Sequence, residues 1–245
     1  MAVISDIHGN LVALRRVLDA IDALQPDSIV CLGDVVGYGP EPEACVELVR
    51  ARATICLAGN HDLAVVGAIE LEHFNPVARE AILWHRSHLS PESLDWLASL
   101  PSRLDLPNVT LAHGSPRAPI WEYVTDSETA AENYDAFDTQ VCLIGHSHLA
   151  IAWRLQRKNS RIRAILEGEA PGALLTLDLE DKWLLNPGSV GQPRDHDPRA
   201  SFAMLDTDAW QWTWHRLEYD IASVEEAILE AGLPEVLGTR LYLGW

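Results

Sequence analysis

The chain has 245 residues, 48% of them hydrophobic, which suits a folded α/β protein with a large core and excludes a disordered chain. Thirty-six acidic and 18 basic residues give a formal charge of −18. We therefore expect no nucleic-acid partner, because nucleic-acid binding normally needs a basic stripe. No apolar run reaches the roughly 20 residues that span a bilayer, and the N-terminus lacks the regions of a signal peptide. Neither a membrane partner nor secretion is expected.

The cysteine pattern predicts a reducing compartment. Cys31, Cys45, Cys56 and Cys142 form no CxxC pair, and three of them lie in apolar, strand-like runs. Small buried thiols are the expected role of such residues, in preference to a zinc or redox site. We therefore expect a cytoplasmic protein.

The first two thirds of the chain alternate between strands and helices. A helix is expected at 11–21, where leucines recur at helical spacing, and another at about 40–50, with Pro40 in its first turn. Residues 64–104 read as a helical insertion. The strands are continuously apolar, as expected of strands covered on both faces, and lie at 2–5, 28–33, 54–58, 108–112 and 140–145.

Short strands dominate the remainder. Trp210, Trp212 and Trp214 alternate, so they share one face of their strand, where core packing is the expected role and a stacking platform for bases the alternative. A helix is expected at 223–231. With no repeat and no linker, we interpret 1–245 as a single domain. The expected strands lie at 150–155, 161–167, 172–179, 182–186, 201–206 and 210–217.

Polar residues of the types that bind metals follow five of the predicted strands. In an open α/β sheet, ligands bind at the carboxyl ends of the strands, so we expect these residues to converge on one crevice. Any one block is weak evidence, since a single histidine or aspartate is more often a surface or capping residue. The blocks are Asp6-Ile7-His8-Gly9-Asn10, Gly33-Asp34, Gly59-Asn60-His61-Asp62, His113-Gly114 and Gly145-His146-Ser147-His148.

The chemistry of these donors predicts a pair of divalent cations. Carboxylate, imidazole and amide groups without thiolates suit Mn²⁺, Fe, Ni or Zn, and we expect manganese first. The donors outnumber the positions around one ion, so two ions sharing Asp34 are the economical solution. Two ions about 3.5–4 Å apart can hold a hydroxide between them and clamp a phosphoryl group.

In this order, the blocks DIHGN, GD, GNHD, HG and GHSH resemble the calcineurin-like metallophosphoesterase superfamily. NPGSVGQPR at 186–194 extends the likeness to the prokaryotic branch of small phosphodiesterase-like proteins. The resemblance implies an α/β fold that is a four-layer α/β/β/α sandwich of two mixed sheets flanked by helices.

The resemblance also implies roles for the site residues. His61 would contact the phosphate or protonate the leaving group, and Asp34 would bridge the two ions. One ion would be held by Asp6, His8, Asp34 and His148, and the other by Asp34, Asn60, His113 and His146.

The sequence departs from the GDxxDRG block of the protein Ser/Thr phosphatases. The stretch 33–39 reads GDVVGYG, so the aspartate that steers the catalytic histidine and the arginine that grips phosphate are both absent. Arg194 is a candidate for the missing phosphate contact, because a guanidinium matches phosphate geometry. The alternative for Arg194 is a surface ion pair with Asp195 or Asp197. What orients His61 is left open.

Further candidates for the pocket are Asn10, Tyr38 and Tyr123. Five histidines fit no block and are expected at the surface or in packing. They are His73, His85, His88, His196 and His215.

The sequence as a whole predicts a metal-dependent phosphoesterase that hydrolyses a small phosphate mono- or diester by attack of a metal-bridging hydroxide. Asp34 and His61 are the catalytic candidates, and Asn60, His61 and Arg194 the substrate-binding ones. A non-catalytic scaffold module, like the retromer subunit with this fold, is one alternative, but every ligand position here is filled. A nuclease is the other, which the acidic charge disfavours. The natural substrate and the oligomeric state stay open.

Overall fold

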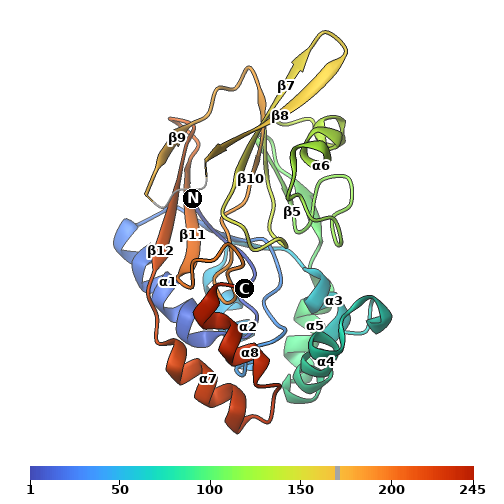
Figure 1. Cartoon of the computed structure of the whole chain (residues 1–245), viewed down its shortest axis with the longest axis vertical. Coiled ribbons are helices and arrows are strands. Elements are labelled where there is room, and N and C mark those ends of the chain that lie inside the picture. Colours follow the sequence, from blue (N-terminus) through green and yellow to red (C-terminus); the bar gives the residue numbers. More distant parts are fainter. Residues whose placement is uncertain (169–171) are drawn as a thin grey trace.

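The computed structural model describes residues 1–168 and 172–245 and contains two six-stranded sheets (Figure 1). Strand order is β3-β2-β1-β11-β12-β9 in the first sheet and β4-β5-β6-β10-β7-β8 in the second. The first sheet comprises β1 (Ala2–Ile4), β2 (Ile29–Cys31), β3 (Ile55–Cys56), β9 (Leu174–Thr176), β11 (Ala200–Asp206) and β12 (Gln211–Leu217). The second comprises β4 (Arg103–Asp105), β5 (Val109–Ala112), β6 (Val141–Leu143), β7 (Ala152–Lys158), β8 (Arg161–Gly168) and β10 (Lys182–Leu185).

Helices cover the outer faces of both sheets (Figure 1). The α-helices are α1 (Leu11–Leu24), α2 (Pro42–Arg52), α3 (Asn60–Val65), α4 (Pro76–His88), α5 (Pro91–Ser99), α6 (Ser127–Glu132), α7 (Ile221–Glu230) and α8 (Val236–Thr239). Short 3₁₀ turns are η1 (Leu71–His73), η2 (Tyr134–Ala136) and η3 (Arg240–Leu243).

Both sheets are mixed, as the family resemblance implies. Strands β1, β2 and β3 run parallel, and β11 pairs antiparallel with β1. In the second sheet β5, β6 and β10 run parallel, and β7 pairs antiparallel with β10. The two parallel triplets place six strand ends where polar loops can meet.

Three apolar clusters separate the layers. In β1, Val3 points into the core between the sheets, while Ala2 and Ile4 point into the core beneath the helices. In β6, Cys142 faces α6 on the outer side of the second sheet, while Val141 and Leu143 face the first sheet. Strands buried on both faces explain the continuous apolar runs in the sequence. The four-layer α/β/β/α arrangement is confirmed.

The tryptophan stripe belongs to the core between the sheets. Trp212 and Trp214 are buried with ring centroids 5.9 Å apart, and Trp210 packs against the same cluster. Core packing is therefore confirmed, because rings buried between two sheets cannot stack on a base.

Two local predictions differ from the structure. The first-turn proline of α2 is Pro42, not Pro40, since Glu41 occupies the cap position. The range 64–104 does not stay helical to its end, because Arg103–Asp105 forms β4, antiparallel to β5. Pairing with a buried strand decides the conformation of such a short segment, and that pairing is invisible locally.

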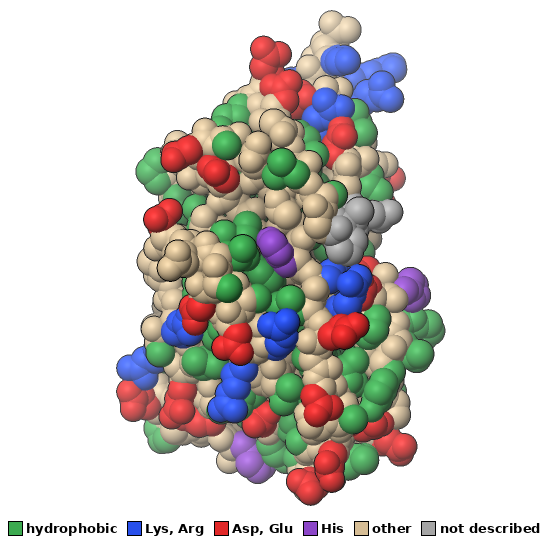
Figure 2. Space-filling model, turned by 90° about the vertical axis from the view of Figure 1, so that its left-hand side faces the viewer, with side chains coloured by type: hydrophobic (Ala, Val, Ile, Leu, Met, Phe, Trp, Pro, Cys, Tyr) green, Lys and Arg blue, Asp and Glu red, His purple; other side chains and the backbone are tan. Residues whose placement is uncertain are grey.

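Basic side chains are distributed unevenly in this acidic molecule. Figure 2 shows Lys and Arg side chains gathered at the end where Figure 1 places the β7–β8 hairpin. Arg157, Lys158, Arg161 and Arg163 are all exposed on this hairpin. No helix among the described residues has the length and apolar character needed to cross a membrane.

Candidate metal centre

The carboxyl ends of the parallel strands bring the predicted ligands together in one buried cluster. Asp6 and His8 follow β1, and Asp34 follows β2. Asn60 begins α3 directly after the β3 loop. The remaining candidates follow β5 and β6 of the other sheet, so the cluster lies between the ends of two sheets and not at the edge of one. They are His113, His146 and His148.

The backbone at this cluster is unusual. Asp6, His8, Asp34, His146 and His148 all have φ between +52° and +64°. Non-glycine residues rarely adopt this left-handed region, which costs roughly 1–3 kcal/mol at each position. Such strain is concentrated at functional sites, because the surrounding structure must hold side chains in positions that an ordinary loop would not provide.

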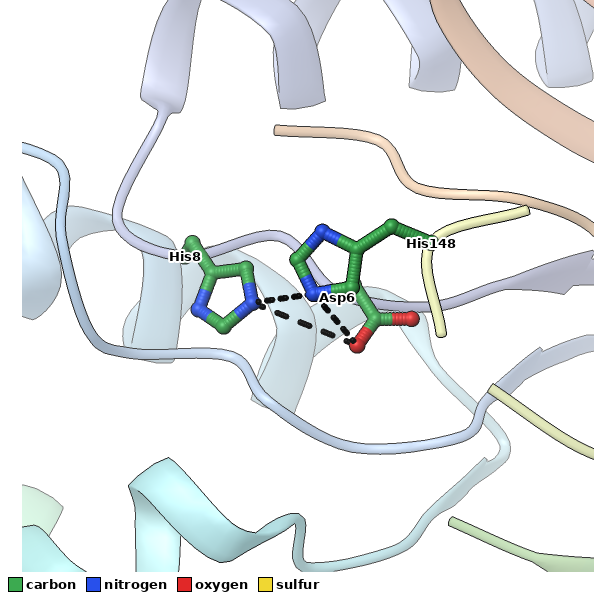
Figure 3. A group of neighbouring side chains, drawn as sticks. All are labelled: Asp6, His8 and His148. Carbon is green, nitrogen blue, oxygen red and sulfur yellow. Dashed lines mark hydrogen bonds and ion pairs between the residues drawn. The ribbon is translucent and has the colours of Figure 1, made fainter. Parts of the chain in front are cut away.

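Asp6, His8 and His148 form the first donor group (Figure 3). The Nε2 atoms of the two histidines are 3.1 Å apart, and Asp6 Oδ1 lies 3.4 Å from His148 Nε2 and 4.0 Å from His8 Nε2. His8 Nδ1 contacts the carbonyl of Val36, and His148 Nδ1 contacts the carbonyl of Gln192. A carbonyl only accepts, so both Nδ1 atoms carry the proton.

This hydrogen bonding leaves acceptor atoms facing one another. Burial lowers the pKa of His8 and of His148 well below its usual range, so both rings are neutral and both Nε2 atoms present lone pairs. Asp6 Oδ1 is buried without a hydrogen-bond partner among the described residues, and burial raises the pKa of Asp6 to about 7. A metal cation satisfies this arrangement, since metal-ligating histidines commonly donate their other ring N–H to a carbonyl.

Asp34, His113 and His146 form the second donor group. His113 Nε2 lies 3.4 Å from Asp34 Oδ2 and 3.2 Å from Asn60 Oδ1, while its Nδ1 donates to the carbonyl of Leu32. Although burial disfavours the charged imidazole, the Asp34 carboxylate raises the pKa of His113 to about 9. His146 Nε2 is buried and without a partner in the described part of the chain.

Asp34 lies between the two groups. Its Oδ2 is 3.7 Å from His8 Nε2 and 3.4 Å from His113 Nε2. Its Oδ1 accepts the main-chain N–H of His61 at 2.8 Å, which fixes the carboxylate in place. A Cβ on Gly59 would lie 2.0 Å from that oxygen, so only glycine fits beside it.

His61 is oriented by aromatic packing. Its ring centroid is 4.5 Å from that of Tyr38, 4.9 Å from that of His8 and 5.1 Å from that of Phe74. Gly37, with φ +100°, approaches so closely that a Cβ would lie 2.4 Å from His61 Nδ1. Burial lowers the pKa of His61 to about 4. Ring packing and close backbone contact thus surround this imidazole, whose Nδ1 has no hydrogen-bond partner among the described residues.

Asp62 supports the centre and was not singled out by sequence reasoning. Its carboxylate is buried and accepts the main-chain N–H groups of Gly59 at 2.9 Å and Val36 at 3.1 Å. It therefore ties the β3 loop to the β2 loop. The sequence signal for this role was an acidic residue, Asp62, three positions after the helix cap Gly59.

His85 has a structural role at the same place. Its Nδ1 accepts the N–H of Gly37 at 2.9 Å, and its Nε2 lies 2.7 Å from the carbonyl of Gly39, to which it donates. Burial lowers the pKa of His85 to about 3, so the ring is neutral. This buried histidine of α4 holds the loop that carries Tyr38, consistent with the packing role expected from the sequence.

Replacing His85 by Leu leaves two buried main-chain groups unpaired and is expected to lower the free energy of unfolding by about 2–4 kcal/mol at pH 7.5. The folded state favours neutral His85. The contribution of His85 to the free energy of unfolding is therefore complete above pH 6.5 and is lost as the pH falls toward 3. Urea unfolding should show the difference between wild type and His85→Leu shrinking by about 2 kcal/mol at pH 5. His88→Leu, at an exposed position of the same helix, should change stability by less than about 0.5 kcal/mol. An equal His85 effect at both pH values would contradict this assignment.

Arg194 places its charge near Asp6 and His61 and makes no ion pair with any acid of the described residues. Asp195 pairs with Arg216, and Asp197 pairs with Arg199. Arg194 Nη2 donates instead to Gln192 Oε1 at 2.8 Å. The ion-pair alternative is therefore wrong.

The remaining candidates are distributed as follows. Asn10 caps α1 and donates to the carbonyl of Gly191, so it is structural. The Tyr123 ring lies 4.0 Å from that of His146, at the second donor group. Like His85, four further histidines of the described chain lie outside the donor groups, and they are His73, His88, His196 and His215.

Comparisons with known proteins agree with this geometry. The model of the calcineurin-like phosphoesterase superfamily domain matches residues 1–209. An uncharacterised protein of Methanocaldococcus jannaschii is 40% identical over 250 residues, covering 100% of this chain and 98% of its own. The crystal structure of a metallophosphoesterase from Sphaerobacter thermophilus is 47% identical, with a TM-score of 0.85 and coverage of 100% and 98%. Phosphodiesterase YfcE of Escherichia coli is 27% identical, covering 83% of this chain and 85% of its own.

The chain therefore belongs to the calcineurin-like phosphoesterase superfamily, in its small prokaryotic branch. Membership places it among the phosphoester hydrolases and implies divalent metal ions. The buried aspartate and histidine groups, with unpaired Nε2 and carboxylate atoms, fit that requirement.

Proposed function

We propose that this protein is a two-metal phosphoesterase that hydrolyses small phosphate mono- or diesters in the cytoplasm. The observation that carries the proposal is the pair of buried donor groups joined by Asp34, whose Oδ2 lies 3.7 Å from His8 Nε2 and 3.4 Å from His113 Nε2. Asp6 Oδ1 and His146 Nε2 have no hydrogen-bond partner among the described residues. The whole chain, 1–245, would act as one catalytic domain, with the helices between 64 and 104 as an insertion.

The donors divide into two sets with Asp34 common to both. Nitrogen and oxygen donors without thiolate suit Mn²⁺ first, and Fe, Ni or Zn as alternatives. Two such ions would supply Lewis acidity at phosphorus and activate a water molecule. The first set is Asp6, His8, Asp34 and His148, and the second is Asp34, Asn60, His113 and His146.

Side chains of this protein bind the substrate and protonate its leaving group. Asn60 and His61 begin α3 beside both donor groups, and Arg194 brings a positive charge to the same region. A phosphate beside His61 raises the pKa of this buried imidazole, since a nearby negative charge favours the protonated form. His61 then gives that proton to the departing alkoxide oxygen.

The preferred substrate is a small ester. The chain has Gly37-Tyr38-Gly39 where protein Ser/Thr phosphatases carry the aspartate and arginine of GDxxDRG. A diester carries one less negative charge than a monoester dianion and depends less on that arginine. The relative named a phosphodiesterase supports diester hydrolysis here.

Removal of divalent metal is expected to abolish hydrolysis of bis-p-nitrophenyl phosphate and p-nitrophenyl phosphate. The buried donors are then left facing one another without a cation, and nothing else in the centre activates water. The measurement is the turnover rate after thorough chelation and after return of Mn²⁺, with metal content determined in parallel. Undiminished turnover in metal-free protein would refute the proposal.

A further inference from the structure

We propose that Arg194 and Arg240, which share contact with the Tyr38 ring, form an anion subsite beside the metal centre. This subsite would take a second negatively charged group of the substrate, at a distance from the phosphate that is hydrolysed. The inference rests on the proposed function and narrows its substrate class to phosphoesters that carry a further phosphate or carboxylate.

The two guanidinium groups converge on one aromatic ring. The Cζ atom of Arg194 lies 5.8 Å from the Tyr38 ring centroid, and that of Arg240 lies 5.9 Å from it. The same ring packs 4.8 Å from His8 and 4.5 Å from His61. The Tyr38 ring therefore contacts both arginines as well as His8, a predicted metal ligand, and His61, the predicted proton donor.

Neither arginine has an Asp or Glu partner among the described residues. Arg194 donates to the amide oxygen of Gln192, and its Nε is buried without a partner in the described chain. Arg240 donates its Nε to the main-chain oxygen of Trp245 at 2.6 Å. Eight of the other arginines in the described chain pair with Asp or Glu. They are Arg50, Arg52, Arg103, Arg117, Arg154, Arg157, Arg199 and Arg216.

The two like charges lie close enough to repel each other. Arg240 is partly buried, and burial together with the nearby Arg194 charge lowers the pKa of Arg240. In a molecule with a formal charge of −18, acidic side chains are abundant, yet no Asp or Glu pairs with either arginine in the part of the chain that the structure describes. An anionic ligand removes the repulsion, and guanidinium groups bind phosphate and carboxylate through paired N–H donors.

The position of Arg240 is built into the fold. It begins η3, directly after α8, and its neighbour Leu241 is buried together with Leu237. Both leucines line a small pocket whose other walls include His8 and Tyr38. The family model ends at residue 209, so this arginine comes from a segment beyond the shared domain. A C-terminal segment packed over a common metal centre is well placed to set the specificity of one branch.

The first test measures anion binding without metal, so that it does not depend on catalysis. Isothermal titration of chelated protein with inorganic phosphate at low salt should show binding, and Arg240→Gln should weaken it by at least about tenfold, or about 1.4 kcal/mol. Arg240→Lys should retain part of the affinity, because charge remains while the bidentate geometry is lost. Arg161→Gln, on the exposed hairpin, changes the net charge equally and should bind as wild type does. Arg194→Gln should weaken phosphate binding as much as Arg240→Gln does. It replaces Arg240→Gln in this test if Arg240→Gln does not fold.

The second test compares three diesters that share a p-nitrophenol leaving group. One carries an ethyl arm and another a 2-carboxyethyl arm, and a third with a 2-phosphoethyl arm separates phosphate from carboxylate recognition. Wild type and Arg161→Gln should prefer the anionic arms by about tenfold in kcat/KM, and this ratio should fall toward one in Arg240→Gln.

The outcomes separate the two proposals. Phosphate binding that is unchanged in both Arg240→Gln and Arg194→Gln, or equal rates on all three diesters in wild type, would overturn the subsite. Intact, arginine-dependent phosphate binding in a protein that hydrolyses no ester with any metal would keep the subsite and refute the proposed function.

Discussion

Asp34→Asn is expected to lose more metal and more activity than a change at any ligand that contacts one donor group. The Asp34 carboxylate lies 3.7 Å from His8 Nε2 and 3.4 Å from His113 Nε2, so among the described carboxylates it alone contacts a histidine of each group. An amide lacks the negative charge that two neighbouring cations need. We expect kcat/KM to fall by at least about 10³-fold, which corresponds to about 4 kcal/mol. Elemental analysis and steady-state kinetics measure the two effects.

Asp6→Asn is the matched comparison, because Asp6 is a buried carboxylate that belongs to the first group only. It should reduce the metal content toward one ion per chain, while Asp34→Asn disturbs both positions. Two bound ions and near-normal turnover in Asp34→Asn would show that this carboxylate does not bridge them.

His61→Gln is expected to keep both metals and to lose about 10²–10⁴-fold in rate, the range typical of a general acid. Proton donation matters most for a poor leaving group. The loss should therefore be larger for alkyl esters than for p-nitrophenyl esters, whose leaving group hardly needs a proton. The measurement is kcat for both ester classes, with metal content in parallel.

His73→Gln provides the control for His61→Gln, because His73 lies outside the donor groups. It should leave rate and metal content within about twofold of wild type, a change of about 0.4 kcal/mol. Loss of metal in His61→Gln would make His61 a ligand instead of an acid, and an equal loss for both ester classes would argue against proton donation.

The sequence by itself determined the fold class and the composition of the candidate centre. Both signals are local, because a strand buried on both faces must be apolar throughout, and a loop at its carboxyl end is free to carry polar residues. The blocks that begin at Asp6, Gly33 and Gly59 could therefore be read without knowledge of their partners. The two-sheet arrangement followed from resemblance, since apolar runs do not reveal which strands pair.

Only the tertiary structure decided how these side chains are held. His85 lies 48 residues from Gly37, and no local pattern distinguishes it from a surface histidine. Arg194 has two acids within three residues, yet Asp195 pairs with Arg216, 21 residues away, and Asp197 pairs with Arg199. The convergence of Arg240 on Tyr38 depends on a C-terminal segment that packs back over the first loops. Contacts between residues far apart in sequence form only when the layers pack, and the free energy of those contacts depends on burial that the order of residues alone does not show.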